Sequence, residues 1–283
     1  MSNIFKSDNQ VTSRVASYSI LVIDSADRSP SQPLNNFNVA QGIILASGYP
    51  TRIGLTTIYY PCATPNVNQV NNTISITNGT TIYTATVPEG FYNNAELATA
   101  IATALNSVGY SGTFTVTSDA KTFYYVVTNS TTAFAFIKTP NKTKDLLLMS
   151  GLQTNTTQAL TQNGTYNSLL YTNFIDIRSN QLTRFQKILD SASDNFSDHI
   201  IERIFIEFGV TSRTSMQSLN TAQFWTRPFT IAYELVNVKW MQYLPQGEFV
   251  ANTDFYLTDD QGEPIYNPVG APNFQMKYLL SET

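Results

Sequence analysis

The chain has 283 residues, 42% hydrophobic and 12% aromatic, which is enough for a packed core and excludes a wholly disordered chain. Its formal net charge is −4 and its Lys and Arg residues form no cluster, which excludes strong nucleic-acid binding by the bulk of the fold, because phosphate contacts need clustered cations. Its single cysteine, Cys62, excludes an internal disulfide.

Residues 1–16 are polar and show no hydrophobic periodicity, which predicts an N-terminal arm that is disordered alone or ordered by a partner. The first residues lack the apolar segment of a signal peptide, and no apolar run approaches the ~20 residues of a membrane span. We therefore expect no membrane span, and synthesis and folding in a reducing compartment inside the cell.

Three β-rich runs follow this arm. Residues 18–23 form an apolar run that ends at Asp24, residues 37–39 begin a short strand, and residues 52–60 form a longer one. The segment 27–33 between the first two runs consists of turn residues, which predicts a loop.

The next segment predicts a hairpin and then a helix. Residues 73–76 and 81–85 flank Asn78-Gly79, a dipeptide whose residues both adopt positive φ easily and which favours a tight hairpin turn. Asn94 is the expected cap of the helix and Gly109 its expected left-handed C-terminal residue. Four apolar side chains at helical spacing form one face: Leu97, Ile101, Leu105 and Val108.

Strand patterns return after the helix. Residues 113–117 and 123–128 alternate around a turn, and residues 134–137 form a third short strand. Residues 141–167 are rich in Asn, Thr and Gln, which predicts a linker or a long surface loop with one apolar patch at 146–148.

The last third is predicted to be strongly β. Residues 168–177 are β-like, residues 181–189 have the spacing of a short helix, and residues 200–208 alternate as a strand. Further strands are expected at 228–236, 238–244, 249–258 and 274–280. Many short strands separated by turn signals are typical of an all-β sandwich or barrel.

Few residues offer catalytic chemistry. His199 is the only histidine, which excludes a metal site with two histidines and leaves a Cys62–His199 pair as the one candidate for nucleophilic catalysis. A buried and inert cysteine is the more common arrangement, so we favour it for Cys62. Nucleotide-binding and hydrolase motifs are absent, although a glycosidase needs only a pair of carboxylates and no motif.

Two groups of carboxylates are candidate metal ligands. Four acidic residues at four-residue spacing would share one helix face and offer oxygens to Ca²⁺: Asp190, Asp194, Asp198 and Glu202. The calcium-loop pattern is missing, so a solvated face is favoured. Asp254, Asp259 and Asp260 lie near a turn, where a structural role is favoured. We therefore predict no catalytic, cofactor-binding or metal-binding residue, and no enzyme activity.

Two further features of the sequence concern sugars: aromatic residues could bind them, and sequons could carry them. Trp225 and Trp240, with the many tyrosines, suit either a sugar-binding platform or core and subunit-interface anchors, and we favour the latter. Glycosylation is not expected without a signal peptide, although seven sequons occur, at Asn71, Asn78, Asn129, Asn141, Asn155, Asn163 and Asn195.

The charged fraction is 13%, against about 25% in an average soluble domain. One interpretation is a surface covered by neighbouring subunits, because interface cores are depleted in Lys, Glu and Asp. The other is an AT-rich genome, which favours Asn codons. The sequence leaves both open.

Two segments resemble a known family. Tyr18-Ser19-Ile20-Leu21-Val22-Ile23-Asp24-Ser25-Ala26-Asp27-Arg28-Ser29, followed by Asn36-Phe37-Asn38-Val39, resembles the opening of minor capsid proteins from virophages and related double-stranded DNA viruses. Val87-Pro88-Glu89-Gly90-Phe91-Tyr92-Asn93-Asn94-Ala95-Glu96-Leu97 resembles the strand, turn and helix start of the same family. The likeness covers about residues 17–110, and its motifs are structural, so it carries no functional residue to this chain.

The resemblance implies a penton-type protein: mostly β, a single jelly-roll β-sandwich with an inserted small α+β domain. The jelly roll would comprise 17–62 and 165–283, and the insert 63–164. Five copies would form a homopentamer at a capsid vertex of the virion, beside the major capsid protein, with the insert available to a host receptor. Another minor capsid protein, or a fibre-type module that binds a receptor or sugar, is the alternative.

Overall fold

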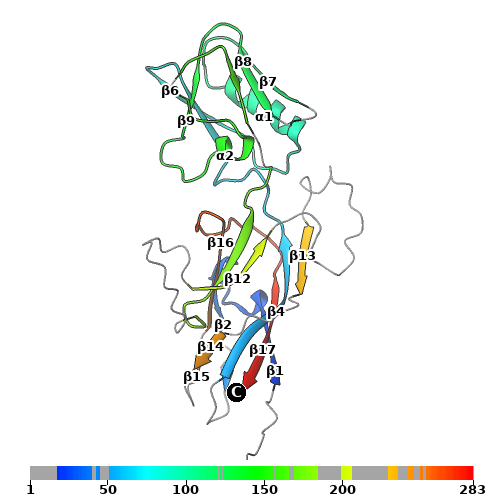
Figure 1. The fold of residues 1–283 in the computed structure, drawn as a ribbon. Coiled ribbons are helices and arrows are strands. Elements are labelled where there is room, and N and C mark those ends of the chain that lie inside the picture. Colours follow the sequence, from blue (N-terminus) through cyan, green and yellow to red (C-terminus); the bar gives the residue numbers. More distant parts are fainter. Residues whose placement is uncertain are drawn as a thin grey trace, which may run out of the picture.

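The computed structural model contains an antiparallel sandwich and, beyond one end of it, a smaller α+β lobe (Figure 1). It describes residues 18–39, 43–44, 51–119, 122, 124–155, 157–165, 169–183, 199–205, 229–234, 241–244, 249–250 and 253–282. The predicted arm at 1–16 lies outside these residues.

The first sheet of the sandwich has the order β1-β17-β4-β13. Its strands are β1 (Tyr18–Asp24), β17 (Gln275–Glu282), β4 (Thr51–Cys62) and β13 (Phe229–Glu234). A further strand, β14 (Met241–Leu244), pairs with the other end of β4 and thus occupies the same edge as β13.

The second sheet has the order β12-β11-β16-β2. Its strands are β12 (Ile200–Phe205), β11 (Phe174–Arg178), β16 (Thr253–Thr258) and β2 (Asn36–Val39). The pairing of β16 with β2 is followed by that of β15 (Phe249–Val250) with β3 (Ile43–Ile44). The run predicted at 249–258 therefore contains two strands.

The strand order identifies a jelly roll. Counting β2 with β3, β13 with β14, and β15 with β16 as single positions gives eight positions along the chain, and these pair first with eighth, second with seventh, third with sixth and fourth with fifth. A hairpin of four such pairs, folded over itself, produces the orders 1-8-3-6 and 2-7-4-5 that the two sheets show. The predicted fold class, mostly β with a single jelly roll, is confirmed.

Aromatic side chains fill the space between the two sheets. Phe37 and Phe255 come from the second sheet, Tyr60 and Tyr278 from the first, and Phe274 lies just before β17; all five are at most 1% exposed. Their ring centroids lie 5.6–6.0 Å apart, the spacing of favourable aromatic pairs. These aromatic side chains belong to one buried core that both sheets share.

The smaller lobe lies between β4 and β11 in the chain, and its described residues form two sheets and two helices. One sheet has the order β6-β5-β9, with β5 (Thr73–Thr77), β6 (Ile82–Thr86) and β9 (Ala135–Ile137). The other has the order β10-β8-β7, with β7 (Phe114–Ser118), β8 (Tyr125–Asn129) and β10 (Thr161–Asn163). The helices are α1 (Asn94–Asn106) and α2 (Leu146–Ser150).

Local signals in this lobe were predicted well. Asn78-Gly79 joins β5 to β6, and Gly79 has a φ of 89°. Helix α1 begins one residue earlier than expected: Asn93, not Asn94, is its cap, and Asn93 and Glu96 exchange side-chain to backbone hydrogen bonds of 2.9 Å. Gly109 is left-handed, with a φ of 74°.

The prediction of a linker or surface loop at 141–167 was wrong. Leu146, Leu147, Met149 and Leu152 are buried in the core of the lobe, and β10 extends the sheet of β8. The polar residues misled the prediction because some are buried and satisfied: Gln162 donates from Nε2 to the Phe134 carbonyl at 2.8 Å. Of the helix predicted at 181–189, residues 181–183 form a turn and the remainder lies outside the described residues.

Candidate functional site

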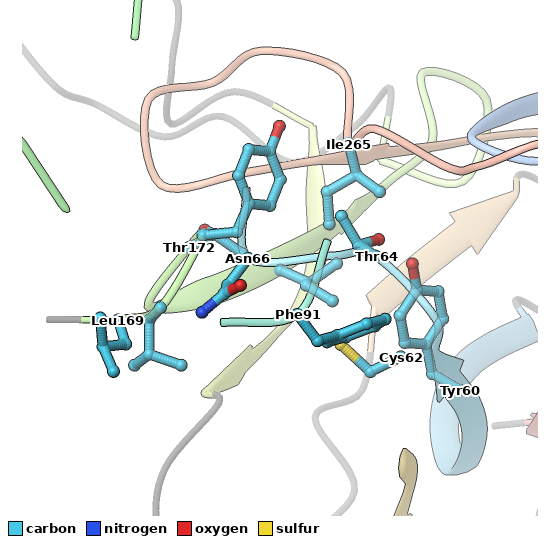
Figure 2. A pocket seen from close by; sticks show the side chains of 11 residues that line it. Tyr60, Cys62, Thr64, Asn66, Phe91, Leu169, Thr172 and Ile265 are labelled. Atoms are coloured by element: carbon cyan, nitrogen blue, oxygen red, sulfur yellow. The ribbon is translucent and has the colours of Figure 1, made fainter. Parts of the chain in front are cut away.

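The two parts of the molecule meet at a junction formed by the end of β4, the segment before β11 and the turn after β16. A small cavity lies there, between residues of the sandwich such as Tyr60 and Ile265 and residues of the lobe such as Phe91 (Figure 2). Its interior volume is about 30 Å³, which accommodates a water molecule or two but no organic ligand. The cavity is therefore a small packing gap between the two parts and no ligand site.

Neutral hydrogen bonds also cross this junction. Thr64, at the exit of β4, donates from its hydroxyl to the Tyr266 carbonyl at 2.7 Å. The Tyr266 hydroxyl donates to Glu89 Oε2, in the turn before α1, at 3.0 Å. These contacts join the lobe to the loop that precedes β17.

A buried charged cluster also crosses the junction. Lys144, just before α2 in the lobe, places its Nζ 2.7 Å from Asp259 Oδ2 and 2.8 Å from Asp260 Oδ1, both in the turn after β16. The side chains of Lys144 and Asp259 are 3% and 0% exposed. Because a lone buried charge costs several kcal/mol, each partner requires the others in order to remain buried.

The surroundings of the cluster hold its geometry. Asp259 Oδ1 accepts the backbone N–H groups of Gln261 at 2.9 Å and Glu263 at 3.0 Å. Lys144 Nζ lies 4.9 Å from the centroid of the Tyr171 ring, within the range of a cation–π contact. Burial, and next the charge of Asp259, raise the pKa of the Tyr171 phenol, so this hydroxyl stays protonated.

The second aspartate is held by the segment that returns to the sandwich. Asp260 Oδ2 accepts the backbone N–H of Asn173 at 3.1 Å and its Nδ2 at 2.8 Å. Burial acts to raise the pKa of Asp260, but the hydrogen bonds from Lys144 and Asn173 outweigh it and hold the pKa below 3.8. Asp260 is therefore ionised at neutral pH.

A hollow of about 360 Å³ lies beside this cluster, and a second ion pair lines it. Asp176 on β11 accepts from Arg203 on β12, with its Oδ1 2.7 Å from the Arg203 Nε. The guanidinium of Arg203 also lies 3.8 Å from the centroid of the Phe174 ring. The hydrogen bond to Asp176 raises the pKa of Arg203, which remains a cation.

Cys62 and His199 do not form a pair. Cys62 and Ile175 line the same cavity, whereas the His199 carbonyl accepts from the N–H of Ser179, four residues beyond Ile175. At ~3.3 Å per residue the two sites are about 13 Å apart along the strand. Burial raises the pKa of the Cys62 thiol to about 12, which keeps it protonated and unreactive near neutral pH. His199 Nδ1 instead lies 2.9 Å from the Thr183 hydroxyl.

The predicted helix face of carboxylates is wrong at Glu202. This residue lies on β12, opposite Ile177 of β11, so helical spacing does not apply to it. Asp190, Asp194 and Asp198 lie outside the described residues. Asp254 accepts from the Ser179 hydroxyl at 2.9 Å and from the backbone of Asn180 and Gln181 at 2.9 and 3.0 Å. This is the structural role that was favoured for it.

Of the two tryptophans and the seven sequons, some lie among the described residues and some do not. Trp225 and Trp240 lie outside the described residues, as does the sequon at Asn195. Asn71 and Asn129 are buried, and their side-chain amides donate to the carbonyls of Asn66 and Ser111 at 2.8 and 3.1 Å. A glycan on either nitrogen would break these bonds. Asn141, Asn155 and Asn163 are exposed, and Asn78 is half-buried.

Lys144 was missed by the sequence analysis. It stands among polar residues in a segment predicted to be a loop, and its two partners follow more than a hundred residues later. The local signal was Asp145, which caps α2 by accepting the N–H of Leu147 at 3.1 Å. Had this cap been used to predict α2, Lys144 would have been expected directly before a buried helix.

In the described part of the chain, no helix is long and apolar enough to cross a membrane. Among the same residues, no group of three or more His, Cys, Asp or Glu side chains is arranged to hold a metal ion.

Comparison with known proteins gave matches to solved structures alone. No protein-family model matches the chain, and no curated protein matches its sequence. The chain is similar to a chain in the 3.5 Å cryo-EM structure of the Sputnik virophage, with 13% identity and a TM-score of 0.41 over 94% of this chain and 97% of that one. It is also similar to the mavirus penton protein in its crystal structure, with 11% identity and a TM-score of 0.49 over 94% of this chain and 99% of that one.

Proposed function

We propose that this protein is a structural capsid protein, the vertex subunit of an icosahedral virion, in which five copies form a ring beside the major capsid protein. The observation that carries the proposal is one complete jelly roll with a separately cored α+β lobe inserted between β4 and β11. The segments that resemble virophage minor capsid proteins form β1, β2 and the start of α1 in this arrangement.

The first sheet offers a surface for contacts between copies. Ile20 and Val22 on the edge strand β1 are 72% and 39% exposed, and Tyr59 on β4 is 42% exposed. Strand β1 pairs with β17 and with no other described strand, and an edge strand of this kind is a surface on which a neighbouring chain can pair. A ring needs such a surface on each copy and a complementary one on the next, related by a rotation that closes.

The lobe supports the second part of the proposal, an outward projection available to a host receptor. It lies beyond one end of the sandwich (Figure 1). The charged cluster and the Tyr266–Glu89 hydrogen bond fix its position relative to the sandwich. We accordingly assign residues 17–62 and 165–283 to the shell-forming jelly roll and 63–164 to the projection.

The proposal predicts the oligomeric mass of the purified protein. Light scattering across a series of protein and salt concentrations is expected to approach five times the chain mass of 31.5 kDa as concentration rises. A limiting mass of three chains would contradict the vertex assignment, and would favour a fibre head or a protein between capsomers.

A further inference from the structure

The Lys144 cluster has the composition of a reactive site as well as that of an ion pair. A primary amine lies 2.7 Å from a carboxylate oxygen, and both side chains are almost fully buried. The fold places the two groups in contact, and well-oriented intramolecular pairs reach effective concentrations of about 10⁵–10⁸ M. An amine and a carboxyl group held in this way are the reactants of an amide bond.

Asp259 is positioned as the electrophile. An attack of Lys144 Nζ on Asp259 Cγ places negative charge on Oδ1, which already accepts the N–H groups of Gln261 and Glu263 at 2.9 and 3.0 Å. Two preorganised backbone donors aimed at a developing oxyanion are the usual means of stabilising a tetrahedral intermediate. Asp260 lacks such a pair of backbone donors, because its Oδ2 is bonded by the backbone and the side chain of Asn173.

Two neighbours are placed to move the protons. Asp260 Oδ1 lies 2.8 Å from Lys144 Nζ and can accept a proton from the ammonium, which frees the nitrogen lone pair. The Tyr171 hydroxyl lies 3.5 Å from Asp259 Oδ2, the oxygen that would leave. The amine, the electrophile, the base and a proton donor are thus gathered in one buried cluster.

We propose that Lys144 and Asp259 form an intramolecular isopeptide bond that joins the lobe covalently to the jelly roll. The Nζ–Cγ bond forms and the Cγ–Oδ2 bond breaks. Asp260 takes protons from the nitrogen and, with Tyr171, delivers them to Oδ2, which departs as water. Ammonium and carboxylate become a neutral amide and one water molecule, so no oxidant, reductant or co-reactant is needed. The proposal does not depend on the assignment to a capsid vertex.

The test is the intact mass of the purified, denatured chain. The linked protein is expected to weigh less than its sequence by the mass of one water molecule. Trypsin is expected to release one branched peptide, in which residues 143–178 are joined to residues 240–277 and cleavage after Lys144 is blocked. An intact mass equal to the sequence mass, with residues 145–178 released as a free peptide, would overturn the proposal.

Two variants separate the bond from the ion pair. Lys144→Arg keeps a cation and removes the amine, so it is expected to show the full sequence mass; a missing water in this variant would place the link elsewhere and refute the proposal. Asp260→Asn keeps Asp259 and removes the base. Most of its chains are therefore expected to remain unlinked and to show the full sequence mass. If the fraction of Asp260→Asn chains that lack the mass of one water molecule equals the wild-type fraction, the role given to Asp260 is disproved.

Discussion

Replacing Lys144 with methionine is expected to lower the free energy of unfolding by about 3–5 kcal/mol, the usual cost of removing one partner from a buried charge pair. Methionine fills a similar volume. Measured against unlinked protein in which Lys144 is still a cation, the loss therefore comes mainly from Asp259 and Asp260, which remain as two adjacent buried carboxylates without their cation. Urea unfolding followed by tyrosine and tryptophan fluorescence measures the change.

Lys142→Met is the matched control. Lys142 lies two residues away and its Nζ donates to the Gln69 carbonyl at 3.0 Å, but this contact is exposed and involves no buried carboxylate. Its replacement is expected to change the unfolding free energy by no more than about 0.5 kcal/mol. Equal losses in the two variants would show that the buried cluster contributes little to stability.

In the unlinked protein, the same cluster makes the free energy of unfolding depend on pH in acid. The pKa of Asp260 is held below its ordinary value of 3.8, so the folded state binds the proton less readily than the unfolded chain does. The stabilising contribution is complete above the unfolded pKa and is lost as the pH falls through the lowered, folded pKa. It therefore acts at neutral pH and disappears only in strong acid.

Replacing Phe134 with alanine is expected to cost about 3–5 kcal/mol and to unfold the lobe selectively. Phe134 is fully buried and lies between Phe114 and Phe136, at centroid distances of 5.1 and 5.4 Å. Among the described residues, the core of the lobe shares none with that of the sandwich. Hydrogen exchange is expected to show lost protection in β5, β7 and β8 and retained protection in β4 and β17.

Tyr124→Ala is the control for Phe134→Ala. Tyr124 also belongs to the lobe, but its side chain is exposed, so its removal is expected to change protection little. Loss of protection in β4 and β17 together with the lobe, in Phe134→Ala, would contradict the division into two separately cored parts.

The elements predicted correctly are those with local causes. The β-rich runs at 18–23 and 52–60 placed β1 and β4, Asn78-Gly79 placed the β5–β6 turn, and the spacing of Leu97 and Ile101 placed α1. These signals act within a few residues, so the sequence contains them in readable form.

The candidate site depended on contacts that no local pattern encodes. Lys144 and Asp260 are 116 positions apart, and a lysine that pairs with buried aspartates has the same local sequence as a solvated one. The polar segment 141–167 was misassigned for the same reason, because the partners of Gln162 appear only once β8 and β9 have formed. Tertiary context decided the burial in both cases.

Labelling of assembled shells tests the central claim, a subunit at the capsid vertex, most directly. An epitope tag placed after Thr80, in the exposed turn of the β5–β6 hairpin, leaves both cores untouched. Shells assembled with the major capsid protein are then decorated with gold-labelled antibody and imaged by electron microscopy. The account predicts label at the five-fold vertices, in clusters of up to five. Label distributed over the faces between vertices would contradict it.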